Sequence, residues 1–264
     1  MSDRMQDTKA EEAVREGDVE QLVTALARGA NPNRLLVSGD SLIHAAAEKN
    51  EALLVGILIR MGANPNLRDA LGDTALHRTA QKNQLGSSII LLDNAADPFA
   101  LSARGDTPVH RAAENGSTGV LAVMLSRGAD PNSRLESDGQ TPLHVAAATN
   151  QRGAAEALIQ YGADIDSIDS NGQTPLMDAA KAGAAEVVQL LLERHASVDL
   201  QDADGRTGLI WAATKGDWPI IVASLVKAGA QVNLKDRSGN TALSRSKLLG
   251  HSSTVQMLTE AKAR

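Results

Sequence analysis

The fold is decided by the stretch Gly139-Gln140-Thr141-Pro142-Leu143-His144-Val145-Ala146-Ala147, because near-copies of it recur along the chain. Aligned on Thr141, the copies follow one another at steps of 33 or 34 residues, at Thr8, Ser41, Thr74, Thr107, Thr141, Thr174, Thr207 and Thr241. A Gly or Asn lies nine residues after each of these positions, which confirms the phase independently. A period of this length predicts stacked supersecondary units.

The motif Thr-Pro-Leu-His-x-Ala-Ala, followed by Gly and then by Gly-Ala-Asp-x-Asn, resembles the ankyrin repeat, most closely at residues 138–166 and 171–199. The resemblance covers essentially all 264 residues. It implies an all-α ankyrin-repeat solenoid of about eight helix-turn-helix units, six central and two caps, with hairpin-like finger loops. We expect one domain over residues 1–264, with units at 8–40, 41–73, 74–106, 107–140, 141–173, 174–206, 207–240 and 241–264.

Within a unit, elementary helix chemistry explains the motif. Thr141 suits a helix N-cap and Pro142 the first helical position, where its missing N–H costs nothing. Ala146 is small enough for two helices to pack closely, and Asn150 tolerates the left-handed conformation that ends the helix.

The two terminal units are expected to be caps, because the end faces of a solenoid have no neighbour and must be polar. The N-terminal unit is expected to turn polar residues to water, namely Lys9, Glu11, Glu12 and Gln21. The C-terminal unit is expected to close the stack with Ser244, Ser246, Thr254 and Thr259.

Three departures from the repeat carry predictions. Ser87 and Ser88 replace aliphatic core residues, and Asn94-Ala95 replaces the stop Gly, so residues 83–97 are expected to be the least stable layer. The first extra residue lengthens the finger at 133–138. The second falls at 216–218, so that Pro219 opens a helix and Trp218 is displayed on a bulge.

Composition limits the class of function. The net charge is −6, which argues against a general nucleic-acid binder. No apolar run is long enough to span a bilayer, and residues 1–7 have no apolar segment behind them, so neither a membrane span nor a secretory signal is expected. Without cysteine there is no disulfide and no thiolate metal site. We therefore expect a cytoplasmic protein.

No catalytic, metal or cofactor site is expected, and the chain is not expected to be an enzyme. Four of the six histidines occupy one repeat slot, and the resemblance implies that they brace neighbouring units, at His44, His77, His110 and His144. His195 stands where other units have Gly. One slot at the finger bases holds Asp, which typically stabilises turns, at Asp69, Asp169, Asp202 and Asp236. No phosphate-binding glycine loop is present.

The resemblance implies that partners bind a concave face made of finger tips and first helices. Aliphatic finger tips stand out near the N-terminal end, and the only two tryptophans stand out near the C-terminal end. Asp73 and Asp106 lie five residues before Arg78 and Arg111 and are expected to pair with them. The candidate partner-binding residues are Leu36, Val37, Leu71, Arg78, Arg111, Arg206, Trp211, Lys215 and Trp218.

The function expected is a non-catalytic protein–protein interaction module that acts as a scaffold, adaptor or inhibitor and is a monomer when unbound. One alternative is a dedicated inhibitor, immunity protein or chaperone-like partner of a single enzyme or toxin, possible in a bacterial source. Another is an engineered repeat binder, against which the irregular units argue. A catalytic protein decorated with ankyrin repeats would need on the order of 100 residues outside the repeats.

Overall fold

A computed structural model describes residues 2–262, and within them it contains sixteen helices and no strand. The chain divides into two compact units, Met1–Asp130 and Pro131–Arg264, which are described separately. The expectation of one continuous domain over residues 1–264 stays a prediction.

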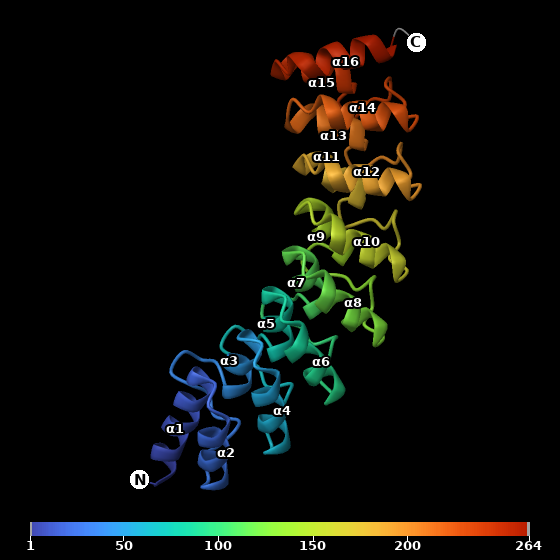
Figure 1. The fold of residues 1–264 in the computed structure, drawn as a ribbon. Helices are drawn as coiled ribbons and strands as arrows, with labels where there is room; N and C mark the ends of the chain where they lie inside the picture. Colours follow the sequence, from blue (N-terminus) through green and yellow to red (C-terminus); the bar gives the residue numbers. More distant parts are fainter. Residues whose placement is uncertain (1, 263–264) are drawn as a thin grey trace. The chain divides into compact units, whose positions relative to one another are not determined.

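The N-terminal unit contains four helix pairs, each a first helix followed by a second one (Figure 1). The pairs are α1 Ser2–Glu16 with α2 Val19–Ala27, α3 Leu42–Glu48 with α4 Ala52–Arg60, α5 Ala75–Lys82 with α6 Leu85–Asp93, and α7 Pro108–Asn115 with α8 Thr118–Ser126. First helices pack on first helices and second helices on second helices, as α3 on α5 and α4 on α6.

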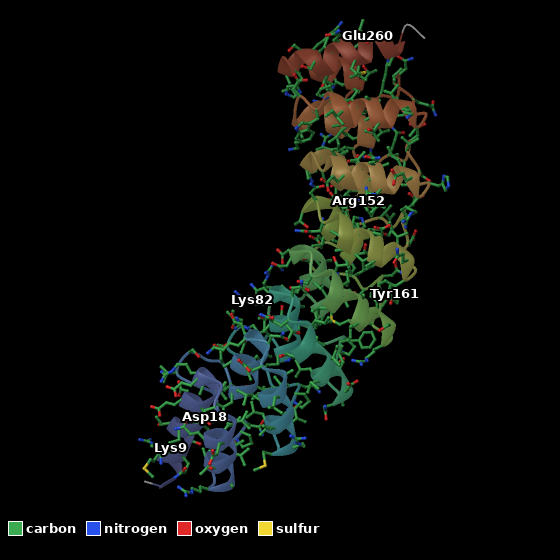
Figure 2. All side chains as sticks on the ribbon, in the orientation of Figure 1. Lys9, Asp18, Lys82, Arg152, Tyr161 and Glu260 are labelled. Atoms are coloured by element: carbon green, nitrogen blue, oxygen red, sulfur yellow. The ribbon has the colours of Figure 1, made fainter. Side chains whose placement is uncertain are left out.

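The C-terminal unit repeats the arrangement. Its pairs are α9 Pro142–Ala148 with α10 Arg152–Gln160, α11 Pro175–Ala182 with α12 Ala185–Glu193, α13 Gly208–Lys215 with α14 Pro219–Lys227, and α15 Ala242–Leu249 with α16 Ser252–Lys262. Side chains fill the space between successive layers (Figure 2). The predicted all-α solenoid of helix pairs is confirmed.

The repeat motif acts through its caps, as predicted. Thr107, Thr174 and Thr207 accept a hydrogen bond from the backbone N–H three residues on, and Pro142 is the first residue of α9. Small residues behind them are fully buried; Ala146, for example, has no exposed surface. Short side chains therefore let the first helices stack closely.

Finger loops precede the first helices and are tied to one another by backbone bonds. In the N-terminal unit the N–H of Ala70 donates to the carbonyl of Gly39 at 3.1 Å, and that of Ala103 to Leu71 at 3.1 Å. In the C-terminal unit the N–H of Ala203 donates to Asn171 at 2.9 Å. Among the described residues the fingers form no strand, only an isolated bridge between Leu35 and Ser41. Each finger is thus held rigidly against the next within its unit.

The predicted start of the first unit at Thr8 was wrong. Helix α1 begins at Ser2, and Thr8 lies inside it with its hydroxyl donating to the carbonyl of Arg4 at 3.0 Å. Glu11 is exposed as expected, while Lys9, Glu12 and Gln21 are only half-buried.

The closing face of the last unit was also partly mispredicted. Ser244 and Thr259 are exposed, but Ser246 and Thr254 are completely buried. The hydroxyl of Ser246 donates to the carbonyl of Leu243 at 3.0 Å, which lets a small polar side chain pack inside α15. Position in the last repeat therefore does not by itself mean exposure.

The insertion at 216–218 was placed correctly, and Pro219 is the first residue of α14. Trp218, however, is half-buried and is not displayed on a bulge. Its ring lies so close to Gly183 that a Cβ added there would meet it at 2.8 Å. The neighbouring Asp217 accepts hydrogen bonds from the backbone N–H groups of Ser253 and Thr254, at 3.2 and 2.7 Å, and so caps α16. The lengthened loop before α14 is thus bonded to the start of α16.

Two helix-ending turns carry a side chain where the other units have Gly. Ala95 has φ of +62° and His195 has φ of +65°, in the left-handed region that favours glycine. The prediction that these residues replace a stop Gly is confirmed, and each turn is locally strained.

Ala95→Gly is therefore expected to raise the free energy of unfolding by about 0.5–1 kcal/mol, since relief of strain exceeds the added freedom of the unfolded chain. Ala228→Gly is the control, because Ala228 ends α14 with φ of −76°. Urea unfolding followed by circular dichroism measures both. A gain for the control, or none for Ala95→Gly, would contradict the strain argument.

The predicted serine pair lies in the core of the third layer, and both Ser87 and Ser88 are completely buried. The hydroxyl of Ser88 donates to the carbonyl of Gln84 at 2.9 Å, whereas the hydroxyl of Ser87 has no hydrogen-bond partner among residues 2–262. A buried hydroxyl without a partner costs free energy. That residues 83–97 form the least stable layer stays a prediction.

Ser87→Ala is expected to stabilise the protein by about 1 kcal/mol, because it removes the unpaired hydroxyl and favours the helix. Ser88→Ala loses a hydrogen bond and is expected to stay within about 0.5 kcal/mol of the parent. Thermal unfolding of the two variants compares them directly. Equal gains for both would show that the unpaired hydroxyl is not the cause.

Candidate functional site

The repeated histidines brace neighbouring layers. The backbone N–H of Thr74 donates to Nδ1 of His77 at 3.1 Å, and Nε2 of His77 donates to the carbonyl of Asp106 at 3.1 Å. His44 and His144 make the same contacts with the carbonyls of Asp73 and Gln173. A carbonyl only accepts, so Nε2 carries the proton and the ring is neutral.

Burial of the imidazoles lowers the pKa of His44, His77 and His144, and bonding of Nε2 to a carbonyl only partly offsets this. Both ring nitrogens of these histidines are engaged in structural bonds. The predicted bracing role is confirmed for them, and they offer no free base or ligand.

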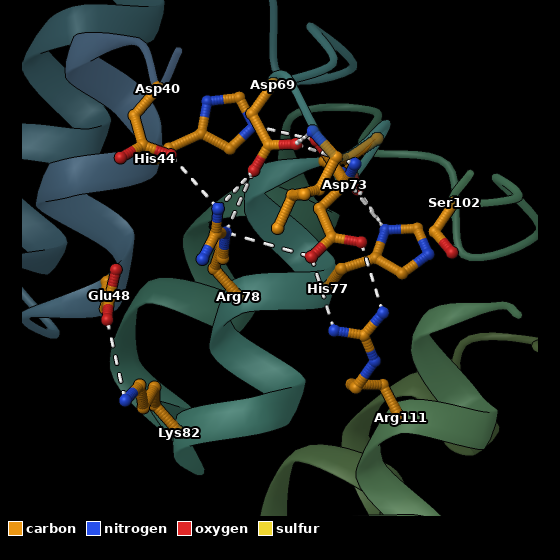
Figure 3. A network of polar contacts seen from close by, with 12 residues as sticks. Asp40, His44, Glu48, Asp69, Asp73, His77, Arg78, Lys82, Ser102 and Arg111 are labelled. Carbon is orange, nitrogen blue, oxygen red and sulfur yellow. Dashed lines mark hydrogen bonds and ion pairs between the residues drawn. The ribbon is translucent and has the colours of Figure 1, made fainter. Parts of the chain in front are cut away.

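A network of arginine and aspartate links successive layers of the N-terminal unit (Figure 3). Nε of Arg111 donates to Asp106 at 2.8 Å, and its two terminal nitrogens donate to the carboxylate of Asp73 at 3.2 Å. The side chain of Arg111 is only 5% exposed. The predicted pairs exist, but Arg111 is buried and therefore not available to a partner.

Arg78 occupies the same repeat position one layer earlier. Its Nε donates to Asp69 at 3.0 Å, and a terminal nitrogen donates to Asp40 at 3.0 Å. Nε also lies 3.8 Å from Asp73, so Asp73 joins the two arginines. The structure brings Arg78 and Arg111 into one network, in which both guanidinium groups are paired with aspartates.

The charges of this network support one another. Burial alone raises the pKa of Asp106, but hydrogen bonds from Arg111 and Ser102 outweigh it and bring the pKa to about 2. Burial likewise lowers the pKa of Arg111, and its bonds to Asp106 and Asp73 more than restore it. Both groups are therefore ionised at neutral pH.

Asp73, His77 and Asp106 are close enough together to be considered as metal ligands, with one atom of each within 4.8 Å of the others. Arg111 already lies between the two carboxylates, and both nitrogens of His77 are bonded. The guanidinium occupies the place that a cation would take, so the group does not fit a metal.

Aliphatic side chains are exposed at the finger tips of the N-terminal unit. Val37 is fully exposed, and Leu71 and Leu35 are exposed by about half or more, while Leu36 is half-buried. Backbone bonds hold their fingers in register. The predicted exposure is therefore confirmed for Val37 and Leu71, whereas Leu36 exposes less apolar surface than expected.

Trp211 lies on the first helix of its pair but is only 6% exposed. Its indole N–H donates to Asp202 at 2.8 Å. The positive groups of Arg206, Lys181 and Lys215 lie 4.6, 5.1 and 5.7 Å from its ring centroid. The structure thus brings together Trp211, Arg206 and Lys215, but Trp211 supports the cations and is itself buried.

Trp218 does not join this group. Its ring packs on Gly183, which ends α11, and on Gly216, which lies in the loop before α14. Lys181, which the sequence interpretation did not select, does join it. Only the layer-to-layer packing of α11 on α13 places Lys181 beside Trp211.

Asp178 lies nine residues after the finger-base Asp169. In three other layers the residue at this place donates a hydrogen bond to its finger-base aspartate, as Arg78 does to Asp69, Trp211 to Asp202 and Arg245 to Asp236. At the equivalent place Asp178, 3% exposed, is itself an acid. The side-chain amide of Gln140 donates to the carboxylate of Asp178 over a long distance of 3.5 Å.

Burial raises the pKa of Asp178 to about 7, with Asp169 and Asp138 adding to the rise and Lys181 opposing it. This carboxyl therefore changes charge near neutral pH. The sequence alone shows that Asp178 is unusual, because it occupies the repeat position where two other layers have Arg78 and Arg111.

In the described part of the chain, no helix is both long and apolar enough to cross a bilayer. The fold agrees with that of solved structures and with a family model. Comparison with curated proteins finds no match. The chain is similar to the crystal structure of the human ASB11 ankyrin repeat domain, with 28% identity and a TM-score of 0.75, covering 84% of this chain and 98% of that one.

It is also similar in fold to the ankyrin repeat domain of Bcl-3, a member of the IkappaB protein family, with 24% identity and a TM-score of 0.73. That match covers 83% of this chain and 98% of the other. A family model for ankyrin repeats in three copies matches overlapping segments at 11–101, 43–135, 91–169, 109–202 and 187–264. The chain belongs to the ankyrin-repeat family.

Proposed function

We propose that this protein binds a partner protein through its helix–finger face, meaning the first helix of each pair and the finger loop before it. Ankyrin repeats generally serve as protein-interaction modules. The observation that carries the proposal is the exposure of Val37 and Leu71 on rigidly stacked fingers. An apolar surface that needs no ordering loses little entropy on binding.

The mode of action is occupation of the partner's surface, as a scaffold, adaptor or inhibitor, with no chemical step. Three observations support this. His44, His77 and His144 are committed to bracing bonds, Arg78 and Arg111 are committed to aspartates, and Asp202 and Asp236 cap their own finger turns.

The test is affinity capture from an extract of the source cells with identification by mass spectrometry, comparing the parent with a Val37→Asp, Leu71→Asp double variant. The double variant is expected to retain on the order of a tenth of the main captured protein, since charged groups would be placed in an apolar contact.

Met61→Asp is the control, because Met61 is exposed at the end of the second helix α4 and so lies off the fingers. It is expected to capture the protein as the parent does. No captured protein, or a loss with the control and none with the finger variant, would contradict the proposal.

A further inference from the structure

Three cations gather around Trp211 from three different segments of the C-terminal unit. Lys181 comes from α11, Arg206 from the finger before α13, and Lys215 from the last residue of α13. All three lie within 5.7 Å of the ring centroid. We call Lys181, Arg206 and Lys215 the tryptophan cation cluster.

Local carboxylates leave most of this charge uncompensated. In the described residues neither Lys181 nor Lys215 forms an ion pair, and Nζ of Lys181 donates to the amide oxygen of Gln173 at 3.2 Å. Arg206 pairs with the exposed Asp204 at 3.2 Å, an arrangement that is weak in water. The buried Asp202 is engaged by the indole of Trp211.

The ring of Trp211 explains how like charges can be held together. Its face attracts cations, and the apolar stems of long basic side chains pack well against aromatic surface. The hydrogen bond to Asp202 fixes the ring. The charged ends are therefore positioned in advance, which reduces the entropy lost when an anion binds.

Accessibility decides which charge a partner meets. Lys215 is exposed and Lys181 and Arg206 are half-exposed. Of the nearby acids, Asp178 and Asp202 are buried and Asp204 is exposed. The outward surface here is consequently positive, although the chain as a whole has a net charge of −6.

We propose that the tryptophan cation cluster binds an acidic segment of the partner protein, with Glu or Asp carboxylates lying between Lys181, Arg206 and Lys215. A protein segment fits better than a nucleic acid, because three cations would neutralise few phosphates, and Asp204 and the net charge of −6 would repel a long polyanion. This inference rests on the proposed function in that the acidic segment belongs to the bound protein.

Asp178 gives the cluster a pH dependence. The groups that face Asp178 are Lys181 on its own helix, Asp169 and Asp138 on the two fingers packed against it, and the amide of Gln140. Since the pKa of Asp178 is about 7, its carboxyl is mostly neutral below that pH and charged above it. Ionised Asp178 competes for Lys181, so an acidic peptide should bind more weakly as pH rises.

The experiment titrates the isotope-labelled full chain with an octaglutamate peptide and follows the two indole N–H resonances by NMR. Trp211 is expected to shift on binding, and Trp218, which packs on Gly183, serves as the internal reference. Octaglutamine and octalysine are the peptide controls. A short single-stranded DNA tests the nucleic-acid alternative.

Lys215→Gln is expected to weaken octaglutamate binding about threefold, and the double variant Lys181→Gln, Lys215→Gln about tenfold or more. Lys227→Gln is the matched control, because it removes one exposed charge from the second helix α14 and is expected to bind like the parent. Binding by the parent is expected to weaken several-fold between about pH 6 and about pH 8, and Asp178→Asn should remove that difference.

Unchanged binding by the double variant, equal binding of octaglutamine, or tighter binding of the DNA would overturn the inference. If octaglutamate does not bind while a partner protein is still captured, only the inference about the tryptophan cation cluster is wrong. If octaglutamate binds as expected and no partner is captured, the proposed function fails instead.

Discussion

Replacement of Arg111 by methionine is expected to lower the free energy of unfolding by about 3–5 kcal/mol. The substitution leaves the carboxylates of Asp73 and Asp106, both almost fully buried, without the guanidinium that bonds them. Methionine preserves much of the side-chain volume, so the loss reflects uncompensated charge more than a cavity. Urea unfolding near neutral pH measures the difference.

Two comparisons separate charge from packing. Adding Asp73→Asn and Asp106→Asn to the Arg111→Met variant is expected to restore part of the stability, because the buried charges are gone. Arg104→Met is the control for a surface pair, since Arg104 is largely exposed and Glu114 is half-exposed, and its effect is expected to be under about 1 kcal/mol.

The pH dependence of the Arg111 effect follows from Asp106. Its pKa is lowered to about 2 in the folded protein from the ordinary 3.8, so the stability that this carboxyl contributes is present above about pH 4. It is lost as pH falls from about 4 toward 2. The deficit of Arg111→Met should shrink over that range, and a deficit independent of pH would contradict the ion-pair explanation.

Asp178→Asn is expected to stabilise the protein by roughly 4 kcal/mol near pH 8 and to leave it nearly unchanged near pH 4. The folded pKa of Asp178 is raised to about 7 from the ordinary 3.8, so the folded state binds this proton more tightly than the unfolded state does. The parent therefore loses stability as pH rises between about 4 and 7. Asparagine cannot ionise, so the variant lacks that loss.

Denaturant unfolding at a series of pH values measures this effect. Asp204→Asn is the control, because Asp204 is exposed and its carboxylate gains little from folding. A variant whose stability follows the same pH curve as the parent would show that Asp178 is not buried and protonated as described.

The repeat pattern predicts the fold because its signals are local. A Thr before Pro, as at 141–142, caps and starts a helix wherever it occurs, and the side chains of Ala95 and His195 mark turns that other layers build with Gly. The bracing role of His77 followed from the family resemblance, since its bonds repeat from layer to layer.

The site could be predicted only in part, because its contacts cross from one layer to the next. Arg111 reaches Asp73, which lies 38 residues earlier, and Lys181 reaches Trp211 on the following first helix. Whether a side chain in the outward row is exposed depends on such neighbours. Trp211 was expected at the surface and is buried because Asp202 and three cations surround it.

The predictions for the first and last layers were wrong for a related reason. Thr8 matched the repeat by spacing, but it lies inside α1, which begins at Ser2. Thr254 was expected on the closing face and is buried beside the loop whose Asp217 accepts from its backbone N–H. Spacing alone does not indicate how an end layer packs.

Site-specific photo-crosslinking tests the central claim, that the helix–finger face is the binding surface. A photoreactive phenylalanine derivative would be introduced singly at Val37, Leu71 or Lys215, and at two exposed control positions that end second helices, Met61 and Tyr161. Tyr161 is labelled in Figure 2. The account predicts crosslinks to one common protein from the first three positions and none from the controls. Crosslinks from Met61 or Tyr161 alone, or from none of the five, would contradict it.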